Sequence, residues 1–132
     1  MTQREVVAAL IFREGKFLIC RRPEGKARAG MWEFVGGKVE EGESKEEALI
    51  RECREEIGVE ISAGGEYMDV LYDYPDISVH LTLFYAEIIR GEPTPMEGNT
   101  LGWITQEDLA KYSFCPADIP IIERLKTEPL IL

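Results

Sequence analysis

The most constraining feature of this 132-residue chain is one segment, SKEEALIRECREEIG, which runs from Ser44 to Gly58. Ser44 and Glu47 have the Ser-x-x-Glu spacing of a capping box, which marks the start of a helix. Gly58 lies where a left-handed residue would end that helix. Between these ends, apolar residues recur every four positions and define one buried stripe, namely Leu49, Cys53 and Ile57. The segment is therefore predicted to be a helix packed on one face.

The same helix concentrates negative charge near its C-terminal end. Glu52, Glu55 and Glu56 are spaced i, i+3 and i+4, so they project from one face. Like charges at this spacing destabilise a helix by about 0.2–0.5 kcal/mol per pair, and they lie at the unfavourable end of the helix dipole. A divalent cation would relieve the repulsion, and carboxylate oxygens suit Mg²⁺ or Mn²⁺. A solvated acidic face is the alternative for these residues taken alone.

The overall charge of the chain bears on which kinds of molecule it can bind. The net charge is −10, which argues against a nucleic-acid polymer because its backbone requires a basic surface. Residues 13–38 nevertheless carry seven basic and three acidic residues, a local balance of +4. A basic stretch just before an acidic helix suits a small anion bound beside a cation, whereas scattered surface charge is the alternative.

Cysteine usage and apolar runs indicate a cytoplasmic protein. The longest apolar run, Val6–Phe12, is too short to cross a membrane, and Met1 to Glu5 contain no apolar signal region. The cysteines are three in number and have no CxxC spacing, which argues against a disulfide framework or a zinc knuckle. We expect all of them to be buried thiols: Cys20, Cys53 and Cys115.

The remaining patterns predict a single α/β domain over residues 1–132. Period-two or continuous apolar runs predict strands at Val6–Phe12, Phe17–Cys20, Tyr67–Tyr74, Ser78–Ile89 and Thr100–Ile104. Pro23 to Met31 is expected to be a loop, and the short apolar run Trp32–Val35 ends at two glycines. A brief helix is expected from Thr105 to about Tyr112, and a last one after Pro116. A mixed sheet with helices on its two sides buries these elements most simply. His80, the lone histidine, is given no catalytic role.

The spacing around the acidic helix resembles the Nudix box, G-x5-E-x7-R-E-U-x-E-E-x-G-U, in which U is a bulky aliphatic residue. Its fixed positions are filled here by Gly37, Glu43, Arg51, Glu52, Glu55, Glu56 and Gly58, and Cys53 occupies the first U position. The phrases WEFVGGKVE and PADIP, with the order of strands, are similar to MutT-type nucleoside triphosphate pyrophosphohydrolases and most of all to the bacterial CTP pyrophosphohydrolase branch. The resemblance implies the Nudix fold over nearly the whole chain, a mixed β-sheet sandwiched between α-helices.

The resemblance also implies roles for particular residues. It implies a Mg²⁺ site, in which Mn²⁺ can substitute, held by Gly37 (carbonyl), Glu52, Glu55, Glu56 and Glu97. Glu43 and Arg51 would brace the preceding loop against the helix, and Glu97 is also the candidate general base. Candidates for binding the substrate are Arg21, Arg22 and Lys38 at the phosphates, with Phe34 and Asp118 at the nucleoside. For Asp118, the alternative is an N-cap of the last helix.

The reaction implied is hydrolysis of a nucleoside triphosphate, of the cytosine or the oxidised-guanine type, to the monophosphate and pyrophosphate. Two alternatives stay open at this point. One is another Nudix substrate, such as ADP-ribose or a dinucleoside polyphosphate, and the other is a non-catalytic nucleotide-binding module. A small-molecule nucleotide is the expected partner, without nucleic acid or membrane, and either a monomer or a homodimer is compatible with the sequence.

Overall fold

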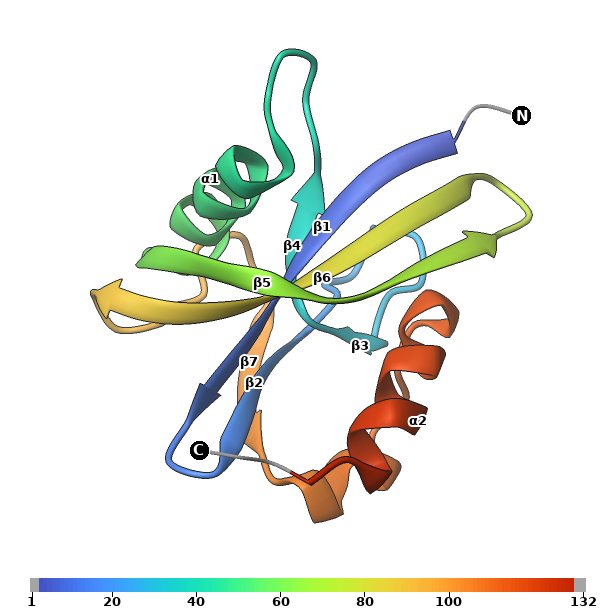
Figure 1. Ribbon diagram of the computed structural model, residues 1–132. Helices are drawn as coiled ribbons and strands as arrows, with labels where there is room; N and C mark the ends of the chain where they lie inside the picture. Colours follow the sequence, from blue (N-terminus) through green and yellow to red (C-terminus); the bar gives the residue numbers. More distant parts are fainter. Residues whose placement is uncertain (1–2, 130–132) are drawn as a thin grey trace.

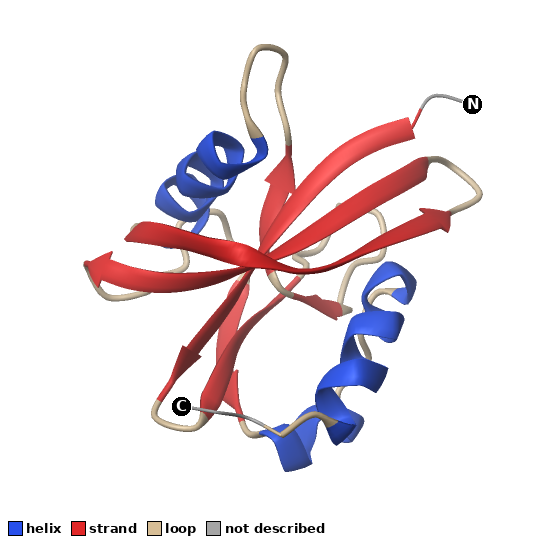
Figure 2. Ribbon diagram, viewed as in Figure 1, coloured by secondary structure: helices blue, strands red, loops and turns tan. Residues whose placement is uncertain are grey.

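The computed structural model describes residues 3–129 as a mixed sheet with helices on its two sides (Figures 1 and 2). Its strands and helices, in chain order, are β1 (Gln3–Arg13), β2 (Lys16–Arg21), β3 (Trp32–Glu33), β4 (Val35–Lys38), α1 (Lys45–Ile57), β5 (Glu60–Asp73), β6 (Ser78–Arg90), β7 (Thr100–Ile104), the 3-10 helices η1 (Gln106–Lys111) and η2 (Pro116–Asp118), and α2 (Ile119–Thr127). The predicted α/β class is thereby confirmed. Residues 1–2 and 130–132 lie outside the described residues. The predictions for the first residues of the chain and for the two ends of the 1–132 domain fall there.

Strand β1 is the centre of the sheet. It runs parallel to β6 and antiparallel to β4, with which it pairs from Val6 to Ala9. Its far end, at Phe12 and Arg13, pairs with β2 through a tight turn. β5 pairs with β6 at one edge, while β3 and β7 both pair with β2. The sheet thus brings β4, which contains the glycine pair Gly36-Gly37, directly against the central strand.

Alternate residues of β1 enter two separate cores. Val7, Ala9 and Ile11 pack in the core under α1, whereas Ala8 and Leu10 pack in the core under α2. Because successive side chains of a strand point to opposite faces, a strand covered on both faces must be apolar almost throughout. This explains the continuous apolar run of β1. The predicted stripe of α1, at Leu49, Cys53 and Ile57, is fully buried in the first core.

The structure extends or divides some predicted strands. β5 begins at Glu60, not at Tyr67, and register shifts against β6 between Ala63 and Glu66 interrupt its alternation. Such bulges disrupt the period-two pattern on which a strand is recognised. The run from Trp32 to Val35 is divided at Phe34, because β3 pairs with β2 while β4 pairs with β1.

The C-terminal predictions are corrected in two places. The helix expected from Thr105 is the 3-10 helix η1, and the Thr105 hydroxyl donates to the Asp108 carboxylate at 3.0 Å instead of capping a backbone N–H. The interpretation of Asp118 as an N-cap is wrong, because its backbone is helical (φ −85°, ψ −14°) and its side chain makes no capping hydrogen bond. Its buried carboxyl is hydrogen-bonded to the Phe34 backbone instead.

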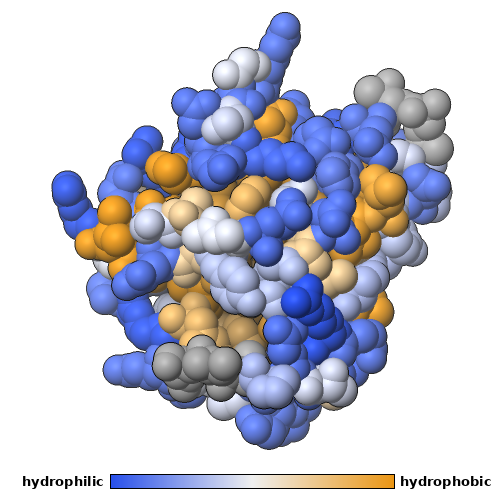
Figure 3. Space-filling model, viewed as in Figure 1, coloured by the Kyte–Doolittle hydropathy of each residue, from blue (hydrophilic) through white to orange (hydrophobic). Residues whose placement is uncertain are grey.

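The cysteine prediction is confirmed: all three thiols are free and buried. Within residues 3–129, no helix is long and apolar enough to cross a membrane. The exposed surface on the face viewed in Figure 3 is mainly hydrophilic, with apolar side chains in scattered patches. His80 lies on β6 between two carboxylates, with ring nitrogens 2.8 Å from both Glu5 and Asp69.

Candidate active site

The acidic helix is fixed at both ends by local interactions. The Ser44 hydroxyl accepts from the Glu47 N–H at 3.1 Å, and the Glu47 carboxylate accepts from the Ser44 N–H at 2.8 Å. At the other end, Gly58 is left-handed (φ 70°) and its N–H donates to the Arg54 carbonyl. The predicted capping box and C-terminal glycine are both confirmed. These caps set the rotation of α1 and therefore the direction in which its glutamates project.

Two glycines of β4 allow unusually close approach of backbone to its neighbours. A Cβ at Gly36 would lie 2.0 Å from the Val7 carbonyl oxygen, which is backbone and cannot move aside. A Cβ at Gly37 would lie 2.4 Å from a carboxylate oxygen of Glu52. Gly36 therefore allows β4 to pack on β1, and Gly37 allows the backbone to contact the acidic face of α1.

Arg51 holds the loop before α1 against the helix. Its guanidinium donates to both carboxylate oxygens of Glu43, at 2.7 and 3.0 Å, and to the Lys38 carbonyl at 2.9 Å. It also donates to Glu52 at 2.9 Å and Glu55 at 3.1 Å. The hydrogen bonds from Arg51 lower the pKa of Glu43 to about 2. These are the contacts that the expected bracing role requires.

Glu56 lies in a very different environment from Glu43. Its pKa is raised to about 8, first by burial and then by the nearby charge of Glu33. No cationic side chain is among its hydrogen-bond partners within the described residues: the Cys20 thiol donates to it at 3.4 Å and the Asn99 amide at 3.3 Å. Burial also raises the pKa of Glu52, although Arg51 opposes that shift. The face of α1 thus holds one carboxylate, that of Glu56, with no cationic hydrogen-bond partner, next to Glu52, whose charge Arg51 compensates in part.

The predicted ligands do not all share one position. Glu52, Glu56 and Glu97 line one pocket, called here the Glu56 pocket, together with Gly37. Glu55 is outside it: its side chain is 51% exposed and paired with Arg51. Within residues 3–129, the carboxylates of Glu52, Glu55 and Glu56 do not converge to within 4.8 Å of one another. The structure therefore favours Glu52 and Glu56 over Glu55 as a ligand pair.

The residues of the Glu56 pocket fit a divalent cation. Their donors are carboxylate and carbonyl oxygens, which hard cations prefer. The side-chain oxygen of Asn99 is buried without a hydrogen-bond partner among the described residues, and its amide nitrogen contacts Glu56. An unpartnered buried oxygen beside an uncompensated carboxylate is what a cation site offers in the absence of the ion.

The expected phosphate-binding residues line the same pocket. Arg21, Arg22 and Lys38 all border it. Arg21 is exposed and donates to the Gly30 carbonyl at 3.3 Å, whereas Arg22 is engaged by Glu33 at 3.1 Å. Basic and acidic side chains therefore meet around one cavity, as the uneven charge of the sequence predicts.

A second pocket adjoins the first and is called here the Asp118 pocket. Both pockets are lined by Arg22, Glu33, Gly37 and Lys38. Asp118 is 4% exposed, and burial, followed by the charge of Glu33, raises its pKa well above the usual range. Phe34 also lines this pocket, but its ring is buried and stacked on Phe114 with centroids 6.1 Å apart. The two expected nucleoside contacts are thus brought together, one polar and one apolar.

Sequence reasoning missed several residues that line these pockets: Cys20, Arg28, Glu33, Asn99 and Cys115. Glu33 lies inside the quoted phrase WEFVGGKVE, so it had a signal that was not used. The others carry no local pattern. Arg28 has left-handed backbone (φ 59°), and its guanidinium stacks 3.8 Å from the centre of the Tyr74 ring.

Comparison with known proteins decides the family. The family model described as "NUDIX domain" matches residues 6–124. This chain belongs to the Nudix family. Nudix hydrolases generally use a divalent metal ion, which agrees with the donor set of the Glu56 pocket.

Individual relatives cover nearly the whole chain. The "CTP pyrophosphohydrolase" of Escherichia coli (strain K12) is 40% identical over 123 residues, 93% of this chain and 91% of the relative. The "8-oxo-dGTP diphosphatase" of the same organism is 32% identical and covers 96% of this chain and 98% of the relative. The crystal structure of a MutT protein from Methanosarcina mazei Go1 has a TM-score of 0.84 at 28% identity, covering 93% and 92% of the two chains. The Nudix fold expected from the sequence is confirmed.

Proposed function

We propose that this Nudix protein is a Mg²⁺-dependent pyrophosphohydrolase of nucleoside triphosphates that releases the monophosphate and pyrophosphate. One observation carries the proposal: the poorly compensated carboxylate of Glu56, with Glu52 next to it, lies beside basic side chains in a pocket that shares lining residues with a second, partly apolar pocket. A triphosphate with its cation suits the first, and a nucleoside suits the second. The names of the Escherichia coli relatives support this class of substrate.

The cation would be held by Glu52, Glu56 and the Gly37 carbonyl, with Glu97 close by; Mn²⁺ can replace Mg²⁺. When bound, it supplies neutralisation of the phosphoryl charge and activation of water for attack. Asn99 and Cys20 orient the Glu56 carboxylate through their hydrogen bonds. Arg51 and Glu43 hold the loop that follows β4 and the end of that strand at Lys38, while Glu55 stays a more exposed, secondary candidate ligand.

Glu97 is the candidate general base. It lies in the exposed loop before β7, and its charge contributes to the raised pKa of both Glu52 and Glu56, so it faces the same site. Its carboxylate would accept the proton of the attacking water. The phosphates of the substrate would contact Arg21 and Lys38, with Arg22 behind them on Glu33.

Asp118 is the residue that we assign to the nucleobase. It is not a helix cap, and its buried carboxyl lines the Asp118 pocket. Burial favours the protonated form of Asp118 in the free protein, and we propose that it reads the base in its ionised form, which hydrogen-bond donors of a bound base favour. An ionised carboxylate only accepts hydrogen bonds, so it pairs with the N4 amino group of cytosine or with the N1–H and N2 amino groups of guanine. Uracil and thymine carry a carbonyl in place of the cytosine amino group. We therefore propose cytosine nucleotides, or oxidised guanine nucleotides, as substrates in preference to UTP or dTTP.

The test is a panel of Mg²⁺ assays scored for both monophosphate and pyrophosphate. It includes CTP, dCTP, 8-oxo-dGTP, UTP, dTTP, ADP-ribose and a dinucleoside polyphosphate. The wild type should prefer the first three. Asp118→Asn should change the ratios of kcat/KM between substrates, by an amount equivalent to about 1–3 kcal/mol for each buried group left unpaired. Equal loss for every substrate, or preference for ADP-ribose, would contradict the assignment.

The proposal takes residues 1–132 as one Nudix domain that acts in the cytoplasm on free nucleotides, not on nucleic acid or at a membrane. A monomer or a homodimer is compatible with it.

A further inference from the structure

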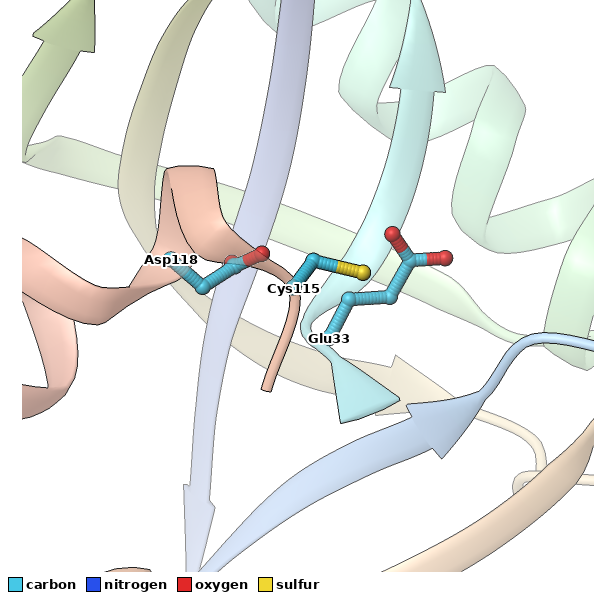
Figure 4. Close-up of side chains that lie close together, drawn as sticks. All are labelled: Glu33, Cys115 and Asp118. Atoms are coloured by element: carbon cyan, nitrogen blue, oxygen red, sulfur yellow. The ribbon is translucent and has the colours of Figure 1, made fainter. Parts of the chain in front are cut away.

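A second group of metal-ligating side chains lies in the Asp118 pocket (Figure 4), and one of its members, Glu33, also lines the Glu56 pocket. A carboxylate oxygen of Glu33, the sulfur of Cys115 and a carboxylate oxygen of Asp118 all lie within 4.8 Å of one another. Figure 4 shows the thiol of Cys115 between the two carboxyl groups, directed toward Glu33. The three side chains come from β3, the residue before η2, and η2 itself.

Backbone hydrogen bonds fix this arrangement before any ligand is considered. The Trp32 N–H donates to the Ser113 carbonyl at 2.8 Å, and the Cys115 N–H donates to the Trp32 carbonyl at 2.9 Å. These bonds place Cys115 beside Glu33. The Asp118 N–H donates to the Cys115 carbonyl at 2.9 Å, so one 3-10 turn brings Asp118 to the same place.

The thiol at the centre of this group is buried and unpartnered. Cys115 is 3% exposed, and its sulfur has no hydrogen-bond partner among the described residues. Burial raises the pKa of Cys115 to about 12, and burial likewise raises the pKa of Glu33 and Asp118. Without a cation, the group therefore retains protons.

Charge and ligand type together indicate which cation would replace those protons. The three ionised groups would carry a charge of −3, which Arg22, donating to Glu33 at 3.1 Å, and Arg28, lining the same pocket, oppose with +2. A cation would neutralise the negative charge that remains. One thiolate with two carboxylates suits Zn²⁺ better than Mg²⁺, because sulfur is a soft ligand and Mg²⁺ prefers oxygen. Three protein ligands would leave a fourth position open to the pocket.

We propose that Glu33, Cys115 and Asp118 form a second cation site, specific for thiophilic divalent ions of the Zn²⁺ type, and that its occupation excludes the nucleoside. The binding half of this inference stands on the geometry alone. The inhibitory half rests on the proposed function, because it requires the substrate to enter the same pocket. Zinc would then be an inhibitor that competes with nucleotide and not with Mg²⁺.

Binding is tested with Cd²⁺ alone on the metal-free full chain, with no substrate present. Thiolate coordination gives a sulfur-to-cadmium charge-transfer band in the ultraviolet, which should saturate at one equivalent. Cys115→Ala should abolish the band. Cys53→Ala and Cys20→Ala are the matched controls and should keep it; Cys20 is the informative one, since its thiol contacts Glu56 in the other pocket. Loss of the band in Cys20→Ala, or its survival in Cys115→Ala, would overturn the site.

Affinity for Zn²⁺, measured by competition with a chelating dye, gives a second readout. Asp118→Asn and Glu33→Gln should each raise the Kd by at least about tenfold, and thermal unfolding should show that both variants fold. Unchanged affinity in both would contradict the proposal. In activity assays, Zn²⁺ should raise the apparent KM for nucleotide in the wild type but much less in Cys115→Ser, which nearly conserves volume. A protein that binds Cd²⁺ as described but hydrolyses no nucleotide would contradict the proposed function and leave the cation site standing.

Discussion

Two glutamates at opposite ends of the same loop and helix have opposite electrostatic environments. Glu43, just before α1, receives two hydrogen bonds from Arg51, and its pKa falls to about 2. Glu56, in the last turn of α1, is half-buried without a cationic partner, and its pKa rises to about 8. Glu43 is neutralised by an arginine of the protein, whereas we propose that Glu56 is neutralised by a bound cation.

The difference shows how charge is divided between folding and function in this unit. Arg51 neutralises the carboxylates that fix the loop, and it reaches Glu52 and Glu55 as well. It does not reach Glu56. An uncompensated buried carboxylate costs stability, so its presence in a pocket beside basic residues indicates a ligand.

The largest expected effect comes from removing the charge of Glu56. Glu56→Gln keeps the size of the side chain, and we expect hydrolysis to fall by roughly a hundredfold or more, about 3 kcal/mol of transition-state stabilisation. Thermal stability should hold or rise, because a neutral amide costs less to bury than a carboxylate. Glu46→Gln, on the exposed first turn of α1, is the matched control. Near-normal turnover in Glu56→Gln would contradict a role for the Glu56 carboxylate in holding the cation.

Glu97→Gln should affect turnover more than binding. If Glu97 accepts the proton of water, kcat should fall by about a hundredfold at neutral pH, while KM changes little because the interaction is made only in the transition state. Steady-state kinetics on the preferred triphosphate measure both constants. An unchanged kcat would return Glu97 to the class of exposed loop acids.

The two glycines of β4 have different roles: Gly36 is needed for the packing of the sheet, and Gly37 for the position of the Glu52 carboxylate. Alanine at position 36 would meet the Val7 backbone, and we expect Gly36→Ala to lower the free energy of unfolding by about 1–3 kcal/mol. The nearest atoms to an alanine Cβ at position 37 would be the flexible carboxylate end of Glu52. Gly37→Ala should therefore leave the melting temperature almost unchanged and lower activity by displacing that carboxylate. Chemical denaturation and kinetics on both variants check this; equal loss of stability would contradict it.

The smallest effects concern the dependence of stability on pH, to which Glu43 and Glu56 contribute with opposite signs. Folded Glu56 keeps its proton up to about pH 8, whereas the unfolded chain loses it near the ordinary value of 4.5. Its contribution to the unfolding free energy is therefore present at low pH and lost as pH rises between these values. Glu43 behaves in reverse: its contribution is present above pH 4.5 and lost as pH falls toward 2.

Melting temperatures of the metal-free protein across this range measure both contributions. Glu56→Gln should flatten the decline above pH 4.5, and Glu43→Gln should flatten the decline below it. Because Glu33 and Asp118 also have raised pKa values, the comparison is variant against wild type. The same dependence of melting temperature on pH in the two variants would contradict opposite pKa shifts of Glu43 and Glu56.

Local signals account for what the sequence predicted well. The capping box at Ser44, the stripe through Leu49 and the left-handed Gly58 lie within fifteen consecutive residues, so α1 and its glutamates were predictable from spacing. The first half of β5 was not, because its bulged pairing with β6 depends on tertiary contact. Thr105 had a capping pattern, but its hydroxyl bonds to Asp108 instead.

The sequence predicted Phe34 and Asp118 at the nucleoside, but the approach of Glu33 and Cys115 to Asp118 escaped prediction for a physical reason. Glu33, Cys115 and Asp118 meet only because the segment after η1 docks on β3 through backbone hydrogen bonds at Trp32. A separation of more than eighty residues leaves no pattern in a single sequence. Asn99 is likewise recognised only from its contact with Glu56.

Calorimetric titration of Mg²⁺ or Mn²⁺ at pH 7, in buffers of different ionisation enthalpy, tests the central claim most directly. If Glu56 is kept uncompensated for a cation, binding must displace its proton, because its pKa lies near 8 without metal. We predict proton release on binding in the wild type, and weaker binding with less proton release in Glu56→Gln. Equal affinity and equal proton release in the two proteins would contradict the account.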